Sequence, residues 1–386
     1  MLMSDHLDMV GVELRATHTQ TRKVNGDIIQ DRVQKIIGAW RSGKFMPLSQ
    51  RPWSINTYCL SKVWYKSNVI DLRVADISSI NSKVKSWLYA DQFEKPEELI
   101  IFRPTSMGGL NMHNVKYKSL SMLIRSFLET AANPNYLHSL YHTALFNHHV
   151  LLDQSWPDPG IPPYFSQEFF STIRHVHLQG TLDVTTVTSR QWYQLLLEDR
   201  VTMTNDTPRS YIRSRQESLS PENDWENTWR LARIKGLNSD EATFLWRLLH
   251  RLLPTLDRVN RMNPSNSPIC KHCDDQIIED LPHALFNCSY NRRTSQALMD
   301  SLTAFQPNLS PTMLLTLNLE VEEKLELPIV WLTSNTLLKI WDCRTEKKRC
   351  DLILVRADLE ARVSLLRESR FKESAGIISQ ILLTLL

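Results

Sequence analysis

Four side chains that can bind a metal ion lie close together in the last third of this chain. Cys270, Cys273, His283 and Cys288 have the spacing C-x2-C-x9-H-x4-C, although cysteine is scarce, with 6 in 386 residues. A structural zinc site takes four such ligands in a tetrahedron, and three cysteines with one histidine are a common set. The spacing therefore predicts a closed, structural zinc site, which leaves no coordination position for a catalytic water.

Other residues in this segment allow weaker alternatives. His272 is a rival ligand, but its ring would have to fold back against the C-x2-C turn, so His283 is favoured. The alternative to a metal site is two buried thiols, a surface histidine and an unrelated third cysteine that share the segment by coincidence. Acidic residues between the ligand pairs are expected to be solvated surface, with one of them available to orient His283; they are Asp274, Asp275, Glu279 and Asp280.

Composition places few limits on function. The chain has 42% hydrophobic residues, 23% charged residues and a net charge of +3, so any nucleic-acid role must come from local basic patches. There is no signal-peptide pattern and no apolar stretch of about 18 residues, so we expect no membrane partner. We expect an intracellular protein with reduced thiols, in the nucleus or the cytoplasm. No small-molecule substrate is evident.

Apolar residues recur at helical spacing along most of the chain, and the sequence therefore predicts a mainly α fold. Only 10 glycines beside 11 tryptophans agree with helices that pack aromatic side chains. A turn is predicted at 102–110, and a linker at 205–224, which is rich in Ser, Asn, Pro and charge. The predicted helices are 27–40, 53–66, 74–89, 114–132, 137–153, 190–199, 225–232, 239–253, 255–262, 291–305, 322–338 and 344–372.

Basic side chains flank the predicted metal site on both sides. Neutralising phosphates with such side chains releases counterions, so they are candidates for nucleic-acid binding. The alternative is that they form only the solvated face of amphipathic helices. Arg247 and Arg251, four residues apart, are expected to share one helical face. The full candidate set is Arg247, Arg251, Arg258, Arg261, Arg292 and Arg293.

Three tryptophans and two cysteines are expected to pack in the core and to have no binding role. Trp225, Trp229 and Trp246 can stack on bases, but tryptophan beside leucines on a helix more often belongs to the core. Cys343 and Cys350 lie seven residues apart and are expected to be packed thiols on one helical face.

The residues around the predicted zinc site resemble a known family. The run 244–249, then Leu253-Pro254-Thr255, then the C-x2-C pair and the run 282–288, looks like the zinc-binding region of LINE-type (non-LTR) retrotransposon reverse transcriptases. One departure is Glu279-Asp280, where family members often carry Glu-Thr. Upstream, Leu48-Ser49-Gln50-Arg51 is similar to the family's Leu-Ser-x-Gly-Arg, with Gln50 in place of glycine.

Other segments extend the resemblance over most of residues 9 to 345. The turn from Pro104 to Met112 is similar to the family's Arg-Pro-x-x-x-Gly-Gly-Leu, and 340–344 fits how such chains end. The resemblance implies a thumb-like helical region at 1–132 and an irregular or helical connector at 133–224. It also implies a helical zinc-knuckle domain at 225–310, followed by C-terminal helices at 311–386.

Polymerisation by this family needs palm carboxylates that hold two metal ions. The run Leu88-Tyr89-Ala90-Asp91-Gln92 resembles one such motif, but Gln92 replaces the second acid. We therefore expect neither Asp91 nor any other residue here to be catalytic, and we expect the fingers and palm to precede Met1. By resemblance the chain binds template RNA or primer–template without synthesis, although the parent family is an RNA-directed DNA polymerase. A protein-interaction module, or a decayed or domesticated retroelement fragment, is the alternative.

Overall fold

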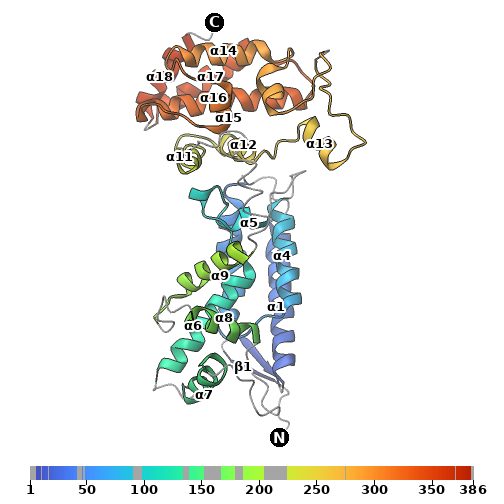
Figure 1. Ribbon diagram of the computed structural model, residues 1–386, viewed down its shortest axis with the longest axis vertical. Helices are drawn as coiled ribbons and strands as arrows, with labels where there is room; N and C mark the ends of the chain where they lie inside the picture. The colour runs from blue at the N-terminus through green and yellow to red at the C-terminus, as the bar shows by residue number, and fades with distance from the viewer. Residues whose placement is uncertain are drawn as a thin grey trace. The chain divides into compact units, whose positions relative to one another are not determined.

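The computed structural model describes residues 6–9, 11–15, 17–40, 46, 48–89, 98–133, 139–151, 167–178, 186–203, 224–273, 275–369 and 371–383. These residues are mostly helical, which confirms the predicted mainly α fold (Figure 1). The chain forms two compact units. Unit 1 comprises Met1–Met46, Gln50–Ala90 and Met112–Arg209, and unit 2 comprises Pro47–Ser49, Asp91–Asn111 and Ser210–Leu386.

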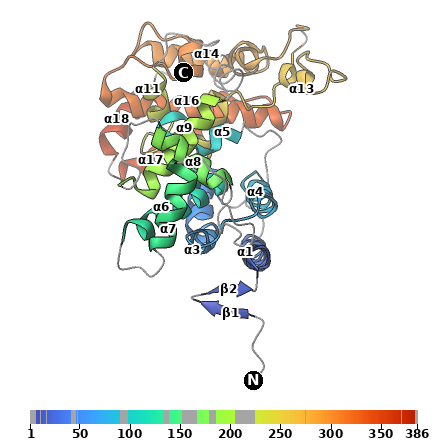
Figure 2. The same ribbon diagram turned by 60° about the horizontal axis from the view of Figure 1, so that its bottom comes forward.

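Unit 1 begins with a two-stranded antiparallel hairpin that the sequence did not reveal (Figure 2). Its strands pair His6 with Arg15 and Met9 with Val12. The elements of unit 1 are β1 (His6–Met9), β2 (Val12–Arg15), α1 (His18–Ala39), α2 (Arg51–Ser54), the π-helical turn η2 (Ile55–Cys59), α3 (Ser61–Ser67), α4 (Val74–Leu88), α6 (Val115–Ala132), α7 (Ser139–Leu145), the π-helical turn η4 (Phe146–Leu151), α8 (Gln167–Leu178) and α9 (Ser189–Met203).

Side-chain caps and an aromatic core account for the helices of unit 1. Asn114 begins α6 because its side-chain oxygen accepts the N–H of Tyr117 at 3.2 Å. Phe127 of α6, Phe169 of α8 and Trp192 of α9 are buried in one cluster. The predicted helix at 53–66 is interrupted by η2, where a π-helical turn inserts an extra residue.

Unit 2 is arranged around one long buried helix, α16. Side chains are buried from Glu326 to Leu337 without a polar face, as expected for a helix that neighbours surround. Helices α11, α12, α14, α17 and α18 pack against it. The elements of unit 2 are α5 (Glu98–Phe102), the 3₁₀ turn η3 (Thr105–Met107), α11 (Trp225–Leu231), α12 (Ser239–Leu249), α13 (Leu256–Met262), the π-helical turn η5 (His283–Asn287), α14 (Arg292–Thr303), α15 (Pro311–Thr316), α16 (Glu323–Thr345), α17 (Leu352–Arg367) and α18 (Lys372–Leu383).

Two chain reversals in unit 2 give helices other bounds than the sequence predicted. Helix α12 ends at Leu249, because Arg251 has φ 53° and Leu252 N–H donates to Arg247 O at 2.7 Å. The predicted helix at 344–372 begins too early, because α16 extends past its predicted end at 338 to Thr345 and a reversal then separates it from the next helix. Lys347 has φ 57°, and the backbone N–H of Lys348 donates to Cys343 O in the last turn of α16. Helix α17 begins separately at Leu352. Neither reversal uses glycine, so neither left the usual stop signal in the sequence.

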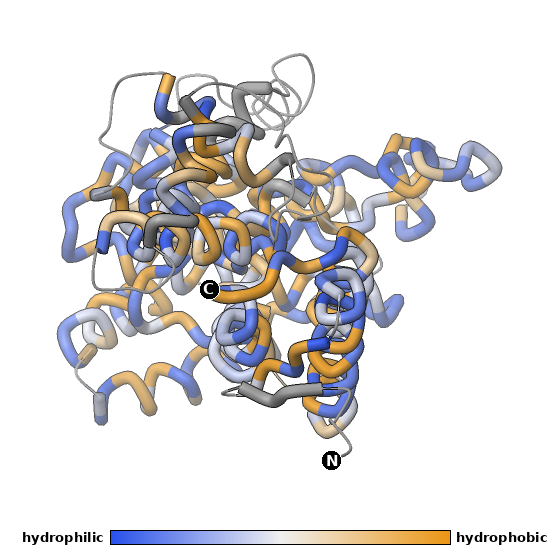
Figure 3. The backbone as a smooth tube through the Cα atoms, turned by 90° about the horizontal axis from the view of Figure 1, so that it is seen from below, coloured by the Kyte–Doolittle hydropathy of each residue, from blue (hydrophilic) through white to orange (hydrophobic). Residues whose placement is uncertain are grey.

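Several sequence-based expectations cannot be compared with this fold. The predicted linker at 205–224 lies outside the described residues apart from Asp224, and the four predicted domain ranges stay a prediction. Many helices carry both hydrophilic and hydrophobic residues along their length, as amphipathic helices do (Figure 3). In the described part of the chain, none of the helices is both long enough and apolar enough to span a bilayer.

Candidate metal centre

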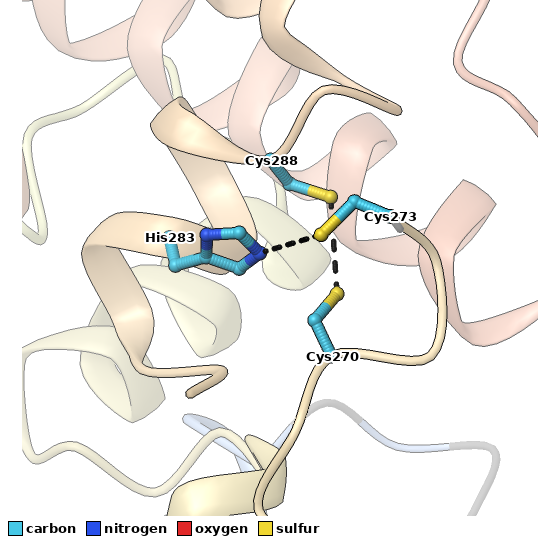
Figure 4. Close-up of side chains that lie close together, drawn as sticks. All are labelled: Cys270, Cys273, His283 and Cys288. Atoms are coloured by element: carbon cyan, nitrogen blue, oxygen red, sulfur yellow. Dashed lines mark hydrogen bonds between the residues drawn. The ribbon is translucent and has the colours of Figure 1, made fainter. Parts of the chain in front are cut away.

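The four predicted ligands lie together in unit 2 (Figure 4). Their ligand atoms are all within 4.8 Å of one another, with Cys270 Sγ 3.9 Å from Cys288 Sγ and Cys273 Sγ 3.4 Å from His283 Nε2. In a tetrahedron with Zn–S about 2.3 Å and Zn–N about 2.0 Å, the matching separations are roughly 3.8 and 3.5 Å. These two distances therefore agree with a zinc ion to about 0.1 Å, whereas ligand atoms as far apart as 4.8 Å would have to approach by about 1 Å.

A narrow loop presents the first two cysteines. Ile269 and Ile278 form an antiparallel bridge, and Cys270 N–H donates to Ile277 O at 2.9 Å. The backbone then reverses at Gln276, which has φ 53°. Because the two sides of the loop are tied together, the C-x2-C pair projects from its tip with both sulfurs on the same side (Figure 4).

A π-helical turn joins the other two ligands. Cys288 N–H donates to His283 O at 2.8 Å, which is the i→i+5 bond of this turn. An α-helix aligns residues three or four apart, so a spacing of five needs this wider turn. The x4 spacing between His283 and Cys288 is therefore spanned by a π-helical turn. Asp280 Oδ1 accepts the backbone N–H of His283 at 2.8 Å, which fixes the start of the turn.

Backbone N–H groups point at the cysteine sulfurs. Cys270 Sγ accepts from His272 N–H at 3.4 Å, and Cys288 Sγ accepts from Tyr290 N–H, each two residues further along the chain. Burial raises the pKa of the Cys288 thiol to about 12, the Tyr290 N–H opposes that rise, and the sulfur of Cys270 adds to it. Sulfurs that are this close and this buried need a cation to become thiolates together, and zinc supplies that charge when bound.

The rival ligand His272 lies outside the four-residue cluster. Its half-buried ring tilts against Tyr290, with 5.7 Å between the ring centroids. Tyr290 in turn packs on the buried cysteines. The ring of His272 therefore lies beside the cluster and contacts it through Tyr290.

Glu279 is a buried charge that the sequence interpretation placed wrongly. Its side chain is 0% exposed and forms an ion pair with Arg344 of α16. The same carboxylate accepts the N–H of Leu256 at 3.0 Å, at the start of α13. Arg344 also lies over the ring of Trp341, 4.5 Å from its centroid. The predicted solvated acid therefore joins the metal loop, α13 and α16, and its partner is 65 residues away in sequence, which no local pattern reveals.

The structure divides the six candidate arginines into two groups. Arg247, Arg251 and Arg258 are half-buried, and Arg258 donates to the backbone oxygen of Arg251. Arg247 and Arg251 do not share a helical face, because α12 ends between them. Three others are exposed: Arg261, which pairs with Asp257 at 2.6 Å, and Arg292 and Arg293 in the first turn of α14.

Two of the three tryptophans belong to the core, as predicted. Trp229 and Trp246 are 3% and 4% exposed. Trp246 Nε1 donates to Gly108 O at 2.8 Å, and the ring of Trp229 stacks on His250 at 4.7 Å. Gly108 has φ 76°, and a Cβ there would lie 2.5 Å from Trp229. The Gly-Gly turn is therefore built against α11 and α12, and glycine is required at 108.

Cys343 and Cys350 do not lie on one helical face. Cys343 belongs to α16, whereas Cys350 follows the reversal at Lys347 and is buried. Burial and the neighbouring Cys343 sulfur raise the pKa of the Cys350 thiol to about 12. The Cys350 thiol is therefore protonated and packed at neutral pH, and Cys350 contributes to the unit as an apolar side chain.

The metal cluster lies within a segment that matches a known protein family. Residues 209–294 match the family described as zinc-binding in reverse transcriptase. This segment resembles the zinc-binding part of reverse transcriptases. This match contains all four cluster residues, so cluster and family together indicate a metal site, with zinc the metal that the family description names. No protein of curated function matches the chain. Asp91, which we expected not to be catalytic, lies outside the described residues.

Proposed function

We propose that this chain is the zinc-bearing, nucleic-acid-binding part of a LINE-type (non-LTR) retrotransposon reverse transcriptase. It binds template RNA or primer–template and does not itself form phosphodiester bonds. The observation that carries the proposal is the cluster of three cysteines and a histidine inside a segment of the reverse-transcriptase zinc-binding type. The exposed Arg292 and Arg293, four and five residues after Cys288, supply charge for phosphates beside the cluster.

The zinc has a structural part in this proposal. Four side chains fill its tetrahedron, so no open position remains for a substrate. The ion holds the C-x2-C loop against η5, and η5 leads within a few residues to α14. The position of the exposed arginines in the first turn of α14 therefore depends on the metal, and metal removal is expected to weaken nucleic-acid binding.

A binding titration tests the proposal. Fluorescence anisotropy of a labelled RNA hairpin with a single-stranded tail is measured against the purified full chain over a salt series. We expect salt-dependent binding that weakens when zinc is removed with a chelator and when Arg292 and Arg293 are changed to Ala. A control with Lys324→Ala and Arg367→Ala removes two exposed charges elsewhere in unit 2. Absence of binding by the unaltered chain would refute the proposal.

A primer-extension assay tests the non-catalytic half of the proposal. The chain is incubated with an annealed RNA template and DNA primer, deoxynucleotides and magnesium. We expect no extended primer, because no residue of this chain is assigned to hold the two catalytic metal ions. Extension that survives repurification of the protein would contradict this part of the proposal and leave the binding part standing.

A further inference from the structure

Three segments that are distant in sequence lie side by side next to the metal cluster. The first is the C-x2-C turn with Lys271 and His272, and the second follows Cys288 and runs through Tyr290 into α14. The third is the reversal between α16 and α17, at 346–349. We call their exposed or half-exposed side chains the knuckle surface; they are Lys271, His272, Tyr290, Arg292, Arg293, Lys347, Lys348 and Arg349.

Specific contacts hold these segments together. His272 and Tyr290 form a ring contact at 5.7 Å, which joins the first segment to the second. Tyr290 Oη donates to Lys347 O at 3.4 Å, and Thr294 Oγ1 donates to Cys350 O at 3.1 Å, which join the second to the third. The last two bonds hold the third segment at two points, at Lys347 and directly after it at Cys350. The surface is therefore a fixed feature of unit 2.

The knuckle surface has an excess of positive charge. It carries six cationic side chains, and the acids within two residues of its segments in the sequence are Asp274, Asp275, Glu346 and Asp351, whereas the whole chain has a net charge of only +3. Glu346 pairs with Lys348 at 2.9 Å. Within the described residues, the exposed side chains of Lys347 and Arg349 have no ion-pair partner. Such a local excess of positive charge attracts a polyanion.

Two aromatic rings at this site indicate which kind of polyanion the surface binds. Tyr290 and His272 lie next to the cations and are both half-exposed. Proteins that bind unpaired nucleotides combine cations for the phosphates with aromatic rings on which bases stack. We infer that the knuckle surface binds unpaired nucleotides of an RNA or DNA strand. This inference rests on the proposed function and names the surface that performs it.

The residues of the knuckle surface differ from the six arginines that the sequence predicted as nucleic-acid contacts. It shares only Arg292 and Arg293 with that set, and its other cations come from the C-x2-C turn and from a chain reversal about 60 residues beyond Cys288. Arg247, Arg251 and Arg258, which precede the site, are half-buried in the fold. The distinguishing prediction is therefore that Lys347 and Arg349 matter for binding.

Charge reversal at the third segment tests the inference. A fluorescein-labelled 12-nucleotide oligouridylate is titrated with the full chain and with the double variant Lys347→Glu/Arg349→Glu. We expect at least tenfold weaker binding, and a salt slope shallower by about 1.4 if each lost phosphate contact on a single strand contributes about 0.7. Glutamate is no more strained than lysine at the positive φ of residue 347, so the reversal of the chain is retained.

A matched pair of single variants controls for general charge effects. Lys348 and Lys324 are both exposed lysines paired with a glutamate two residues earlier, at 2.9 and 2.6 Å. They lie at opposite ends of α16, whose 23 residues span about 34 Å at 1.5 Å per residue. Lys348→Glu is expected to weaken binding several-fold, whereas Lys324→Glu is expected to leave it within twofold. Equal effects of the two variants would overturn the inference.

The aromatic part has its own variants. Tyr290→Leu is expected to weaken oligouridylate binding roughly tenfold, because one stacked base is lost, whereas Tyr290→Phe keeps the ring and the affinity. Zinc content is measured in both, since Tyr290 packs on the cysteines. If Tyr290→Leu loses zinc, the comparison moves to a blunt duplex of the same length, which must bind the unaltered chain more weakly than the oligonucleotide.

Three further results would overturn the inference. They are unchanged binding by Lys347→Glu/Arg349→Glu, equal affinity for the blunt duplex, and equally tight binding of polyglutamate, which would indicate a site for acidic proteins. Each of them presupposes that the unaltered chain binds RNA in the first place. Failure of the unaltered chain to bind therefore counts against the proposed function, whereas binding that the variants do not change counts against the knuckle surface alone.

Discussion

Replacement of Glu279 by Gln tests whether the buried ion pair with Arg344 stabilises the metal loop. The Glu279 side chain is 0% exposed and that of Arg344 is 11% exposed, so water screens neither charge well. Glutamine keeps an acceptor for the Leu256 N–H, which lies 3.0 Å from the carboxylate, and removes only the charge. The variant therefore leaves a guanidinium in the interior without its counter-charge.

The expected magnitude follows from the geometry. Breaking a buried pair by removing one partner costs about 3–5 kcal/mol of unfolding free energy. We expect the lower end, roughly 3 kcal/mol, because Arg344 keeps its contact with the ring of Trp341 at 4.5 Å. The pair itself is imperfect, since Glu279 Oε2 and Arg344 Nε are buried without hydrogen-bond partners. Its net contribution is therefore small, although the removal of one partner is costly.

A double-mutant cycle separates these two quantities. Glu279→Gln and Arg344→Met are each expected to destabilise, and the double variant is expected to lose about 2 kcal/mol less than the sum of the two. Urea unfolding is followed by tryptophan fluorescence and by zinc release to a chromophoric chelator. The control is Glu326→Gln, whose partner Arg230 is 53% exposed and whose loss should cost at most about 1 kcal/mol. Additivity within about 0.5 kcal/mol in the cycle would refute the reasoning.

Three further predictions concern the metal site and the core of unit 2. Cys273→Ser is expected to reduce bound zinc from about one ion per chain to nearly none by elemental analysis, and Cys59→Ser, which changes a buried thiol of unit 1, is expected to leave it at one. Gly108→Ala is expected to destabilise unit 2 by about 2–4 kcal/mol in urea unfolding, because the residue has φ 76° and its Cβ would lie 2.5 Å from Trp229. Burial lowers the pKa of His250 to about 4, so the unfolded chain binds a proton below about pH 6.5 that the folded chain does not. Stability is therefore complete above pH 6.5 and is expected to fall by roughly 3 kcal/mol towards pH 4, and His250→Gln should flatten this dependence.

Local patterns in the sequence located most of the described helices and the four residues of the metal cluster, but not α5, α8, α15 or α18. The predicted helices at 114–132 and 74–89 match α6 and α4 to within one residue. The ligands were predictable because all four lie within 19 consecutive residues. The ends of α12 and α16 were not, because Arg251 and Lys347 adopt positive φ without glycine.

Contacts between distant segments account for the rest of what the sequence did not reveal. The burial of Glu279 depends on Arg344, and the basic surface depends on a reversal that places Lys347 beside Tyr290. Nothing in the spacing around Cys288 indicates either partner. Six arginines close to the ligands were the natural candidates, but half of them are half-buried, since a helix that packs through its leucines also buries the stems of neighbouring arginines.

The metal loop is held at two places, by the ion at its cysteines and by the ion pair between Glu279 and Arg344. Glu279 N–H donates to Pro268 O at 2.9 Å, and the Glu279 carboxylate is fixed by Arg344 whether or not zinc is bound. His272 N–H, in contrast, donates only to the sulfur of Cys270, whose position depends on the ion. Chelation of zinc should therefore abolish the hydrogen-exchange protection of the His272 amide and leave that of Glu279 largely intact. In the zinc-bound Glu279→Gln variant, the amide of residue 279 should lose its protection before the amide of His272 does. Simultaneous loss at both amides on chelation would mean that the ion alone holds the loop and that the buried pair contributes nothing independent.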